Sequence, residues 1–172
     1  MKRIYILLLS ISIFVSAFGG HPFVGIEGAY APQRYWHTAI EIFNIGANAG
    51  YELEFGKVFI APQIAVGYEN TKHEYGAPGG PTLIGHSNDF YASLAFNFGV
   101  KIYKGFAIYT APMVKYTSFD AHKSYHWGMY WNFGVSYSFS RFKVFCSYNQ
   151  QVTKMYIYNR FNPICAGIQF YL

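Results

Sequence analysis

The chain has 172 residues with a formal net charge of +5, and it is 52% hydrophobic, 22% aromatic and only 12% charged. Average soluble domains carry about 25% charged residues, roughly twice this share. The composition therefore excludes a disordered chain, a coiled coil and an ordinary soluble enzyme with a charged surface. The length fits a single domain. The two cysteines are too few for a disulfide scaffold, and they form no CxxC pair.

The N-terminus has the organisation of a secretory signal peptide. Lys2 and Arg3 precede an apolar run over residues 4–15, and the small residues of Val15-Ser16-Ala17 follow as a cleavage pattern. The run is too short for a membrane anchor, which needs about 20 residues. We expect cleavage after Ala17 and a mature domain over residues 18–172. Cleavage lowers the net charge from +5 to +3, which is too small to predict a nucleic-acid partner.

The mature chain alternates between large apolar and small or polar residues. In residues 88–103, one set of alternate positions, which we call one parity, consists of Phe90, Ala92, Leu94, Phe96, Phe98, Val100 and Ile102. From 126 to 139 one parity holds Trp127, Met129, Trp131, Phe133, Val135, Tyr137 and Phe139. A period of two residues predicts β-strands with one wholly apolar face.

Two folds bury such a face: a soluble β-sandwich points it inward, and a membrane barrel points it at lipid. The segments exceed the 5–6 residues usual in globular strands and reach the ~9–11 that cross a bilayer at a tilt. Their opposite faces hold Gly, Ser, Asn and Ala where a soluble sheet would present Lys and Glu. Aromatic residues gather at strand ends, as membrane interfaces require: Phe55, Tyr103, Phe106, Phe139 and Phe142. We therefore predict a transmembrane barrel.

The alternation predicts eight antiparallel strands in an up-and-down barrel. Their expected ranges are 23–31, 45–55, 57–69, 88–103, 106–119, 126–139, 142–152 and 162–172. Tight turns at Gly56, 104–105 and 140–141 alternate with longer loops near 32–44, 70–87, 120–125 and 153–161, and this rhythm is typical of outer-membrane barrels. Pro62 and Pro112 fall at lipid-facing positions of two predicted strands. Each proline predicts the loss of one ladder hydrogen bond and a local bulge.

The chain resembles the small eight-stranded outer-membrane barrels of the OmpA/OmpX-like superfamily. The signal peptide, the alternating strands and the terminal strand carry the resemblance over the whole mature chain. The terminal strand has apolar residues at every second position: Ile164, Ala166, Ile168, Phe170 and Leu172. These families usually end in Phe, from which Leu172 departs. The resemblance implies location in a Gram-negative outer membrane, contact with its lipid and lipopolysaccharide, and biogenesis through periplasmic chaperones and the barrel-assembly machinery.

Eight strands enclose an interior that their own side chains fill. The inward parity places a candidate polar network there, formed by Glu27, Glu52, Gln63, Lys101 and Lys115, and adds Asn132, Lys143 and Gln169. Buried charges must be paired, so we expect Glu–Lys contacts. A structural polar plug is favoured over a narrow ion path, and a general porin is not expected.

The predicted loops mix aromatic residues with arginine, the residue types that are enriched at binding hot spots. The candidate contact residues are Arg34, Tyr35, Trp36, His37, Tyr156, Tyr158 and Arg160. For Trp36 and Trp127 a place in an interface belt is the favoured alternative. Five histidines also fall in or beside these loops: His37, His73, His86, His122 and His126. They would make the loops acid-responsive, but no ligand geometry predicts a metal site.

An enzyme that modifies lipid A is the main alternative function. His122-Lys123-Ser124 resembles the His-x-Ser arrangement of the lipid A deacylases, but no Asn follows Ser124 and no acidic partner is placed beside it.

Cys146 and Cys165 fall on opposite faces of neighbouring predicted strands, which favours two free thiols. We therefore expect no cofactor, and a structural or surface-binding role through the external loops, with a narrow small-solute channel as a further alternative.

Overall fold

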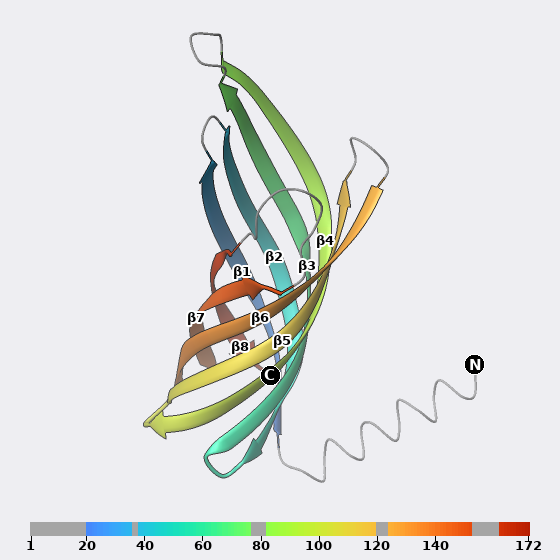
Figure 1. The fold of residues 1–172 in the computed structure, drawn as a ribbon. Coiled ribbons are helices and arrows are strands. Elements are labelled where there is room, and N and C mark those ends of the chain that lie inside the picture. The colour runs from blue at the N-terminus through green and yellow to red at the C-terminus, as the bar shows by residue number, and fades with distance from the viewer. Residues whose placement is uncertain (1–19, 36–37, 77–81, 120–123, 153–161) are drawn as a thin grey trace, which may run out of the picture.

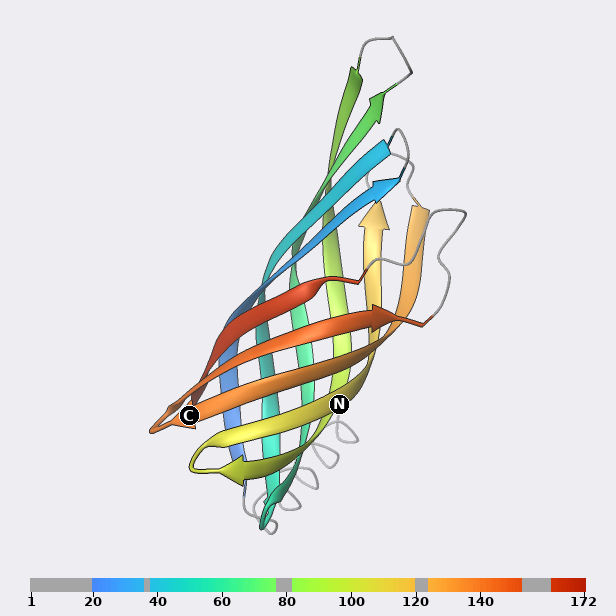
Figure 2. The same ribbon diagram turned by 60° about the vertical axis from the view of Figure 1, so that its left-hand side comes forward.

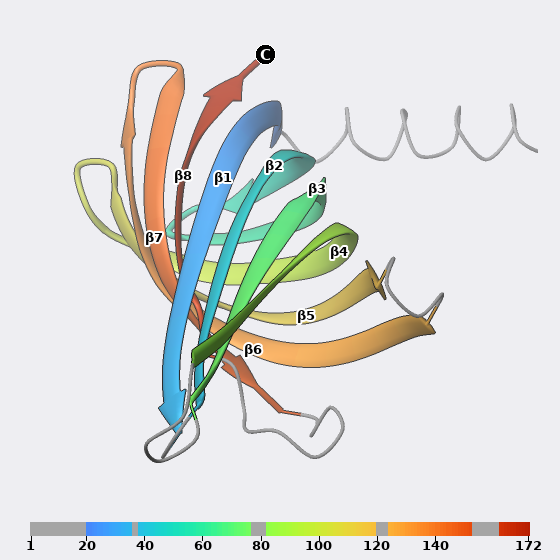
Figure 3. The same ribbon diagram turned by 90° about the horizontal axis from the view of Figure 1, so that it is seen from above.

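The computed structural model describes residues 20–35, 38–76, 82–119, 124–152 and 162–172, which form one closed antiparallel barrel (Figure 1). The strands are β1 (Gly20–Tyr35), β2 (Thr38–Phe55), β3 (Val58–Gly76), β4 (Thr82–Tyr103), β5 (Phe106–Phe119), β6 (Ser124–Phe139), β7 (Phe142–Gln151) and β8 (Ile164–Tyr171). Each strand pairs with the next, and β1 pairs with β8 to close the ring seen from above in Figure 3. The prediction of eight antiparallel strands in a barrel is confirmed.

Two-residue turns join the strands at one end of the barrel. Residues 56–57 join β2 to β3, residues 104–105 join β4 to β5, and residues 140–141 join β6 to β7. The first residue of each turn has a positive φ, 66° at Gly56 and 53° at Ser140, for example. Positive φ at this position belongs to the primed turns, whose twist matches that of the flanking strands. We call this end of the barrel the turn end.

The strands point their large apolar side chains away from the barrel axis. Phe96 is 43% exposed, Trp131 41% and Phe133 50%, whereas the alternate positions beside them are buried or half-buried. Within the described residues, no helix is long and apolar enough to cross a membrane. The apolar exterior and the polar interior confirm the predicted inside-out arrangement of a membrane barrel.

Two belts of exposed or half-exposed aromatic residues bound the apolar exterior. The lower belt, at the turn end, holds the five predicted residues Phe55, Tyr103, Phe106, Phe139 and Phe142. The upper belt holds Tyr30, Phe43, Tyr68, Phe90, Tyr116 and Trp127. Between Val58 and Tyr68, β3 advances about 33 Å at ~3.3 Å per residue, which spans roughly 25 Å at a tilt of ~40°. This span equals the apolar band of outer-membrane barrels.

The first four strands continue well beyond the upper belt. They have 16 to 22 residues, whereas β7 and β8 have 10 and 8. Figures 1 and 2 show β3 and β4 rising farthest from the turn end. Most residues of the predicted loops 32–44 and 70–87 are therefore strand, and this part of the prediction is wrong. Outside the lipid both faces of a strand are wet, so the apolar alternation stops while the hydrogen-bonded ladder continues.

The two strand prolines interrupt the ladder without making a bulge. In β2–β3 the pairs Gly50↔Gln63 and Leu53↔Ile60 keep one register on either side of Pro62. The β4–β5 ladder likewise keeps its register across Pro112, and its one irregularity lies between Lys101 and Tyr103. The predicted bulges are therefore wrong. Because proline lacks only the N–H, each strand loses local pairing with one neighbour and keeps its course.

Candidate functional site

The lower lumen holds a buried group of charges. Lys143 Nζ lies 2.6 Å from Glu52 Oε2, and the two side chains are only 7% and 2% exposed. The Tyr171 hydroxyl donates to the same carboxylate at 2.9 Å. Lys101 Nζ lies 2.6 Å from Glu54 and 3.9 Å from Glu52. These contacts join β2, β4, β7 and β8 across the barrel, as charges in a closed interior require.

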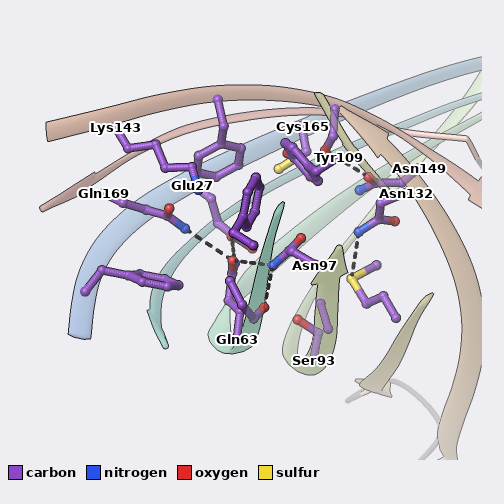
Figure 4. A pocket seen from close by; sticks show the side chains of 17 residues that line it. Glu27, Gln63, Ser93, Asn97, Tyr109, Asn132, Lys143, Asn149, Cys165 and Gln169 are labelled. Carbon is purple, nitrogen blue, oxygen red and sulfur yellow. Dashed lines mark hydrogen bonds between the residues drawn. The ribbon is translucent and has the colours of Figure 1, made fainter. Parts of the chain in front are cut away.

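Glu27 occupies the centre of the lumen among amide groups. Asn48 Nδ2 and Gln63 Nε2 donate to Glu27 Oε2 at 2.9 and 3.1 Å. Gln63 in turn accepts hydrogen bonds from Gln169 at 3.2 Å and Asn97 at 3.3 Å, as drawn in Figure 4. No lysine forms an ion pair with Glu27 among the described residues. The central carboxylate is therefore held by neutral donors, and the Glu–Lys contacts predicted for the lumen occur instead at Glu52 and Glu69.

A second buried ion pair lies toward the upper end of the lumen. Lys115 of β5 contacts Glu69 of β3, and its ammonium group lies 4.7 Å from the centre of the Tyr91 ring. Lys143 has the same arrangement below, 4.7 Å from the centre of the Phe59 ring. Each buried ammonium thus has a carboxylate and an aromatic face, which together offset the cost of removing it from water. The structure places all five predicted network residues inside the barrel, in three separate groups.

Inward-facing aromatic rings fill the space between these polar groups by covering glycines. A Cβ atom at each of the covered glycines would collide with a ring atom. The pairs are Phe23 over Gly50, Phe59 over Gly99, Tyr91 over Gly46 and Gly67, Tyr109 over Gly134, and Phe145 over Gly167. This feature was not predicted from the sequence, although glycine and a large aromatic at inward positions of neighbouring strands are the signal that predicts it.

The middle of the lumen leaves little empty space. Two interior cavities have volumes of about 50 and 30 Å³, and one water molecule needs at least ~10–15 Å³. At the turn end the lumen widens into a hollow of about 410 Å³, lined by His21, Glu54, Lys101 and Arg141 among others. The described residues therefore enclose room for a few waters at the centre, which is the arrangement of a polar plug.

The predicted loop contact residues fall mostly outside the described part of the chain. Trp36, His37, Tyr156, Tyr158 and Arg160 lie in segments 36–37 and 153–161, which the structure does not describe. Arg34 and Tyr35 belong to the end of β1, where they pair with Ala39 and Thr38 of β2. Their assignment to a loop is therefore wrong, since β1 continues to Tyr35.

The extension of β3 and β4 beyond the upper belt presents a mixed surface. Lys72 Nζ lies 2.5 Å from Glu74, and this contact raises the pKa of Lys72. On the other face of β3, His73 stacks on Tyr75 with their ring centres 6.1 Å apart. Partial burial lowers the pKa of His73, and the charge of Asp89 opposes this shift. Apolar side chains are nevertheless exposed, since Tyr75 is 49%, Leu83 69% and Ile84 58% exposed.

We define the extracellular extension as residues 31–35, 38–42, 69–76 and 82–89. Among the described residues, β4 pairs with β3 alone above the pair Phe90↔Ser118, and β1 pairs with β2 alone above Tyr30↔Ile164. Within the described residues these four segments form one sheet, in which β3 and β4 rise farthest from the turn end (Figure 2). The sequence could not reveal it because the alternation of apolar residues ends at the upper belt.

The described residues assemble no metal site, and the neighbouring His86 and Ser87 do not form a catalytic pair. No three His, Cys, Asp or Glu residues gather as metal ligands within the described ranges. His86 and Ser87 occupy adjacent positions of β4 and so point to opposite faces, and the Ser87 hydroxyl donates to Asp89 at 3.1 Å. His122 and Lys123 lie outside the described residues, and Ser124 is the first residue of β6.

The two cysteines are free. Cys146 is exposed on the outer face of β7, and Cys165 is buried in the lumen on β8. Cys165 pairs in the ladder with Ser147, and Cys146 pairs with Ala166, so the two thiols lie on opposite faces of the sheet. The predicted pair of free thiols with these orientations is confirmed.

No family model and no curated protein matches the chain. Among solved structures, Neisserial surface protein A is similar with a TM-score of 0.56 at 16% identity, over 90% of this chain and 99% of that one. The outer-membrane protein Ail of Yersinia pestis gives 0.54 at 13%, over 90% and 100%. OprG of Pseudomonas aeruginosa gives 0.50 at 12%, over 89% and 93%. At these identities the likeness shows the fold, which is that of the small outer-membrane β-barrels, as predicted.

Proposed function

We propose that this chain is an outer-membrane protein that binds a partner outside the cell through its extracellular extension. The observation that carries the proposal is the unequal height of the barrel wall, with β3 and β4 continuing eight residues past Tyr68 and Phe90. These residues are not needed to cross the membrane. They expose Tyr75, Leu83 and Ile84 to water, and exposed apolar groups rimmed by polar residues mark interaction sites.

The filled lumen supports this assignment over solute transport. Cavities of about 50 and 30 Å³ at the centre have room for a few waters, whereas the aqueous channels of porins are enclosed by 16–18 strands. Ail, one of the similar proteins, is described as an attachment invasion locus protein and has been crystallised with the heparin analogue sucrose octasulfate. That description concerns Ail, and it suggests sulfated polysaccharide as a first probe here.

The lipid-facing surface adds a second part to the proposal. We assign lipopolysaccharide and phospholipid to the apolar band between the two aromatic belts, because rings at both edges match the levels of the two membrane interfaces. The alternating terminal strand β8 suits recognition by the barrel-assembly machinery after delivery by periplasmic chaperones. No catalytic step is proposed.

Shortening the extension tests the binding role. In the variant, residues 71–87 are replaced by Asn-Gly, so that the hydrogen-bonded pair Asn70 and Asn88 (2.8 Å) flanks a two-residue turn. The binding of cells that display the full-length protein or the shortened variant is measured on heparin-coated and extracellular-matrix-coated surfaces. We expect at least a tenfold loss of binding with unchanged heat-modifiable gel mobility. Binding that equals the full-length protein on every surface it recognises would refute the proposal.

A further inference from the structure

Each of the three two-residue turns carries one basic residue. These residues are Lys57, Lys104 and Arg141, and all three are exposed. None forms an ion pair within the described part of the chain. The acidic residues nearest in the strands, Glu52 and Glu54, are engaged by Lys143 and Lys101. The turn end therefore presents three exposed basic groups that have no ion-pair partner among the described residues.

The three charges are distributed around the barrel just below the lower aromatic belt. They lie in the turns β2–β3, β4–β5 and β6–β7, so two strands separate Lys57 from Lys104 and Lys104 from Arg141, and four strands separate Arg141 from Lys57 around the ring. The belt residues Phe55, Tyr103 and Phe142 are the immediate neighbours of the turns. Lys104 Nζ lies 5.5 Å from the centre of the Tyr103 ring. Aromatic rings mark the interface, so the three basic groups stand at the level of lipid headgroups.

We propose that the turn end binds the anionic headgroups of phospholipids in the periplasmic leaflet, through Lys57, Lys104 and Arg141. Short turns of outer-membrane barrels face the periplasm, where the surrounding leaflet is glycerophospholipid. Arg141 offers a planar fork for a phosphate, and the two lysines offer point charges. Three charges spread around a ring suit a leaflet that surrounds the barrel, whereas one compact protein would meet them only by covering the whole mouth.

The proposal is tested by NMR of the mature barrel in nanodiscs. Backbone amide shifts are recorded in phosphatidylcholine and with increasing phosphatidylglycerol. We expect shifts concentrated at residues 56–57, 104–105 and 140–141 that saturate with phosphatidylglycerol and fade at high salt. A basic residue near an anionic surface gives roughly a fivefold preference, so each Lys→Gln or Arg→Gln change should raise the half-saturating fraction by about fivefold.

Three further arms separate the alternatives. In the variant Lys57→Gln, Lys104→Gln, Arg141→Gln the shifts at the turns should vanish, whereas exchanging the same lysines for arginine should keep them. A control, Arg34→Gln with Lys72→Gln, removes two basic charges at the opposite end, on β1 and β3, and should leave the turn shifts intact. The proposal fails if the triple turn variant still responds, if the control loses the response, or if free inorganic phosphate in pure phosphatidylcholine reproduces it.

Discussion

Removing one partner of a buried lumen ion pair should cost more stability than removing both. Lys143→Met leaves Glu52, which is 2% exposed, without its closest cation. An uncompensated buried charge typically costs 3–5 kcal/mol. Glu52 would keep the Tyr171 hydroxyl at 2.9 Å and Lys101 at 3.9 Å, so we expect about 3 kcal/mol, more than a hundredfold in the unfolding equilibrium.

The upper pair supplies the internal comparison. Glu69 has only Lys115 as an ion-pair or hydrogen-bond partner among the described residues, so Lys115→Met should cost more, about 5 kcal/mol. The double change Glu52→Leu with Lys143→Met leaves no charge behind and should recover most of the loss.

Urea unfolding in phospholipid vesicles, followed by tryptophan fluorescence and by gel mobility without boiling, measures these differences. Equal stability of the double variant and of Lys143→Met would refute the argument, because the loss would then come from packing. If Lys115→Met lowers the free energy of unfolding by less than Lys143→Met does, the loss is not controlled by the number of partners that remain at Glu69 and Glu52.

Three other results are expected. Gly46→Ala places a Cβ against the Tyr91 side chain and the Val66 carbonyl, and it should destabilise the barrel by about 1–3 kcal/mol in the same assay. In the control Gly28→Ala the nearest atom to the new Cβ is 3.4 Å away, so the free energy of unfolding should be nearly unchanged. Burial lowers the pKa of His73, so the folded extension binds fewer protons than the opened one. The stability of the extension should therefore be full above pH ~6.5 and decline as the pH falls below that value. Hydrogen-exchange protection of β3 and β4 should fall between pH 7.5 and 5.5, and it should not change over this range in His73→Gln. Ser124→Ala should leave the mass spectrum of lipid A from expressing cells unchanged, and loss of a mass difference that the parent chain produces would instead establish the enzymatic alternative.

The membrane-spanning wall could be predicted because lipid imposes a one-sided rule. Most outward positions between the belts must be apolar, so residues such as Phe96 and Phe133 mark the lipid-facing side of their strands. The lower belt followed from the same rule, since each turn interrupts the alternation next to an aromatic. Where lipid ends the rule ends, which is why the strand residues 69–76 and 82–89 were predicted as loop.

The lumen could be predicted in composition and only partly in contacts. Parity places Glu27, Glu52 and Lys115 inside, but it cannot say which strands face one another across the axis. The partners Lys143 and Glu52 are 91 residues apart, and Lys115 and Glu69 are 46 apart, so their meeting depends on the tilt and stagger of the closed barrel. For the same reason the amide partners of Glu27 could not be chosen over lysine.

Because the lumen is filled, the surfaces with which this chain can bind a specific partner lie at its two ends. The band between the belts is common to any barrel of this height, and the interior is occupied by its own rings and ion pairs. The belts fix the depth of the barrel, and basic turns bound to the periplasmic leaflet would oppose displacement toward the cell surface. From Glu69 to Gly76, β3 advances a further ~23 Å, or about 18 Å along the membrane normal at a tilt of ~40°. Anchorage at one end would therefore hold the extension at a constant height above the membrane, which is the condition for reaching a partner that does not itself enter the lipid.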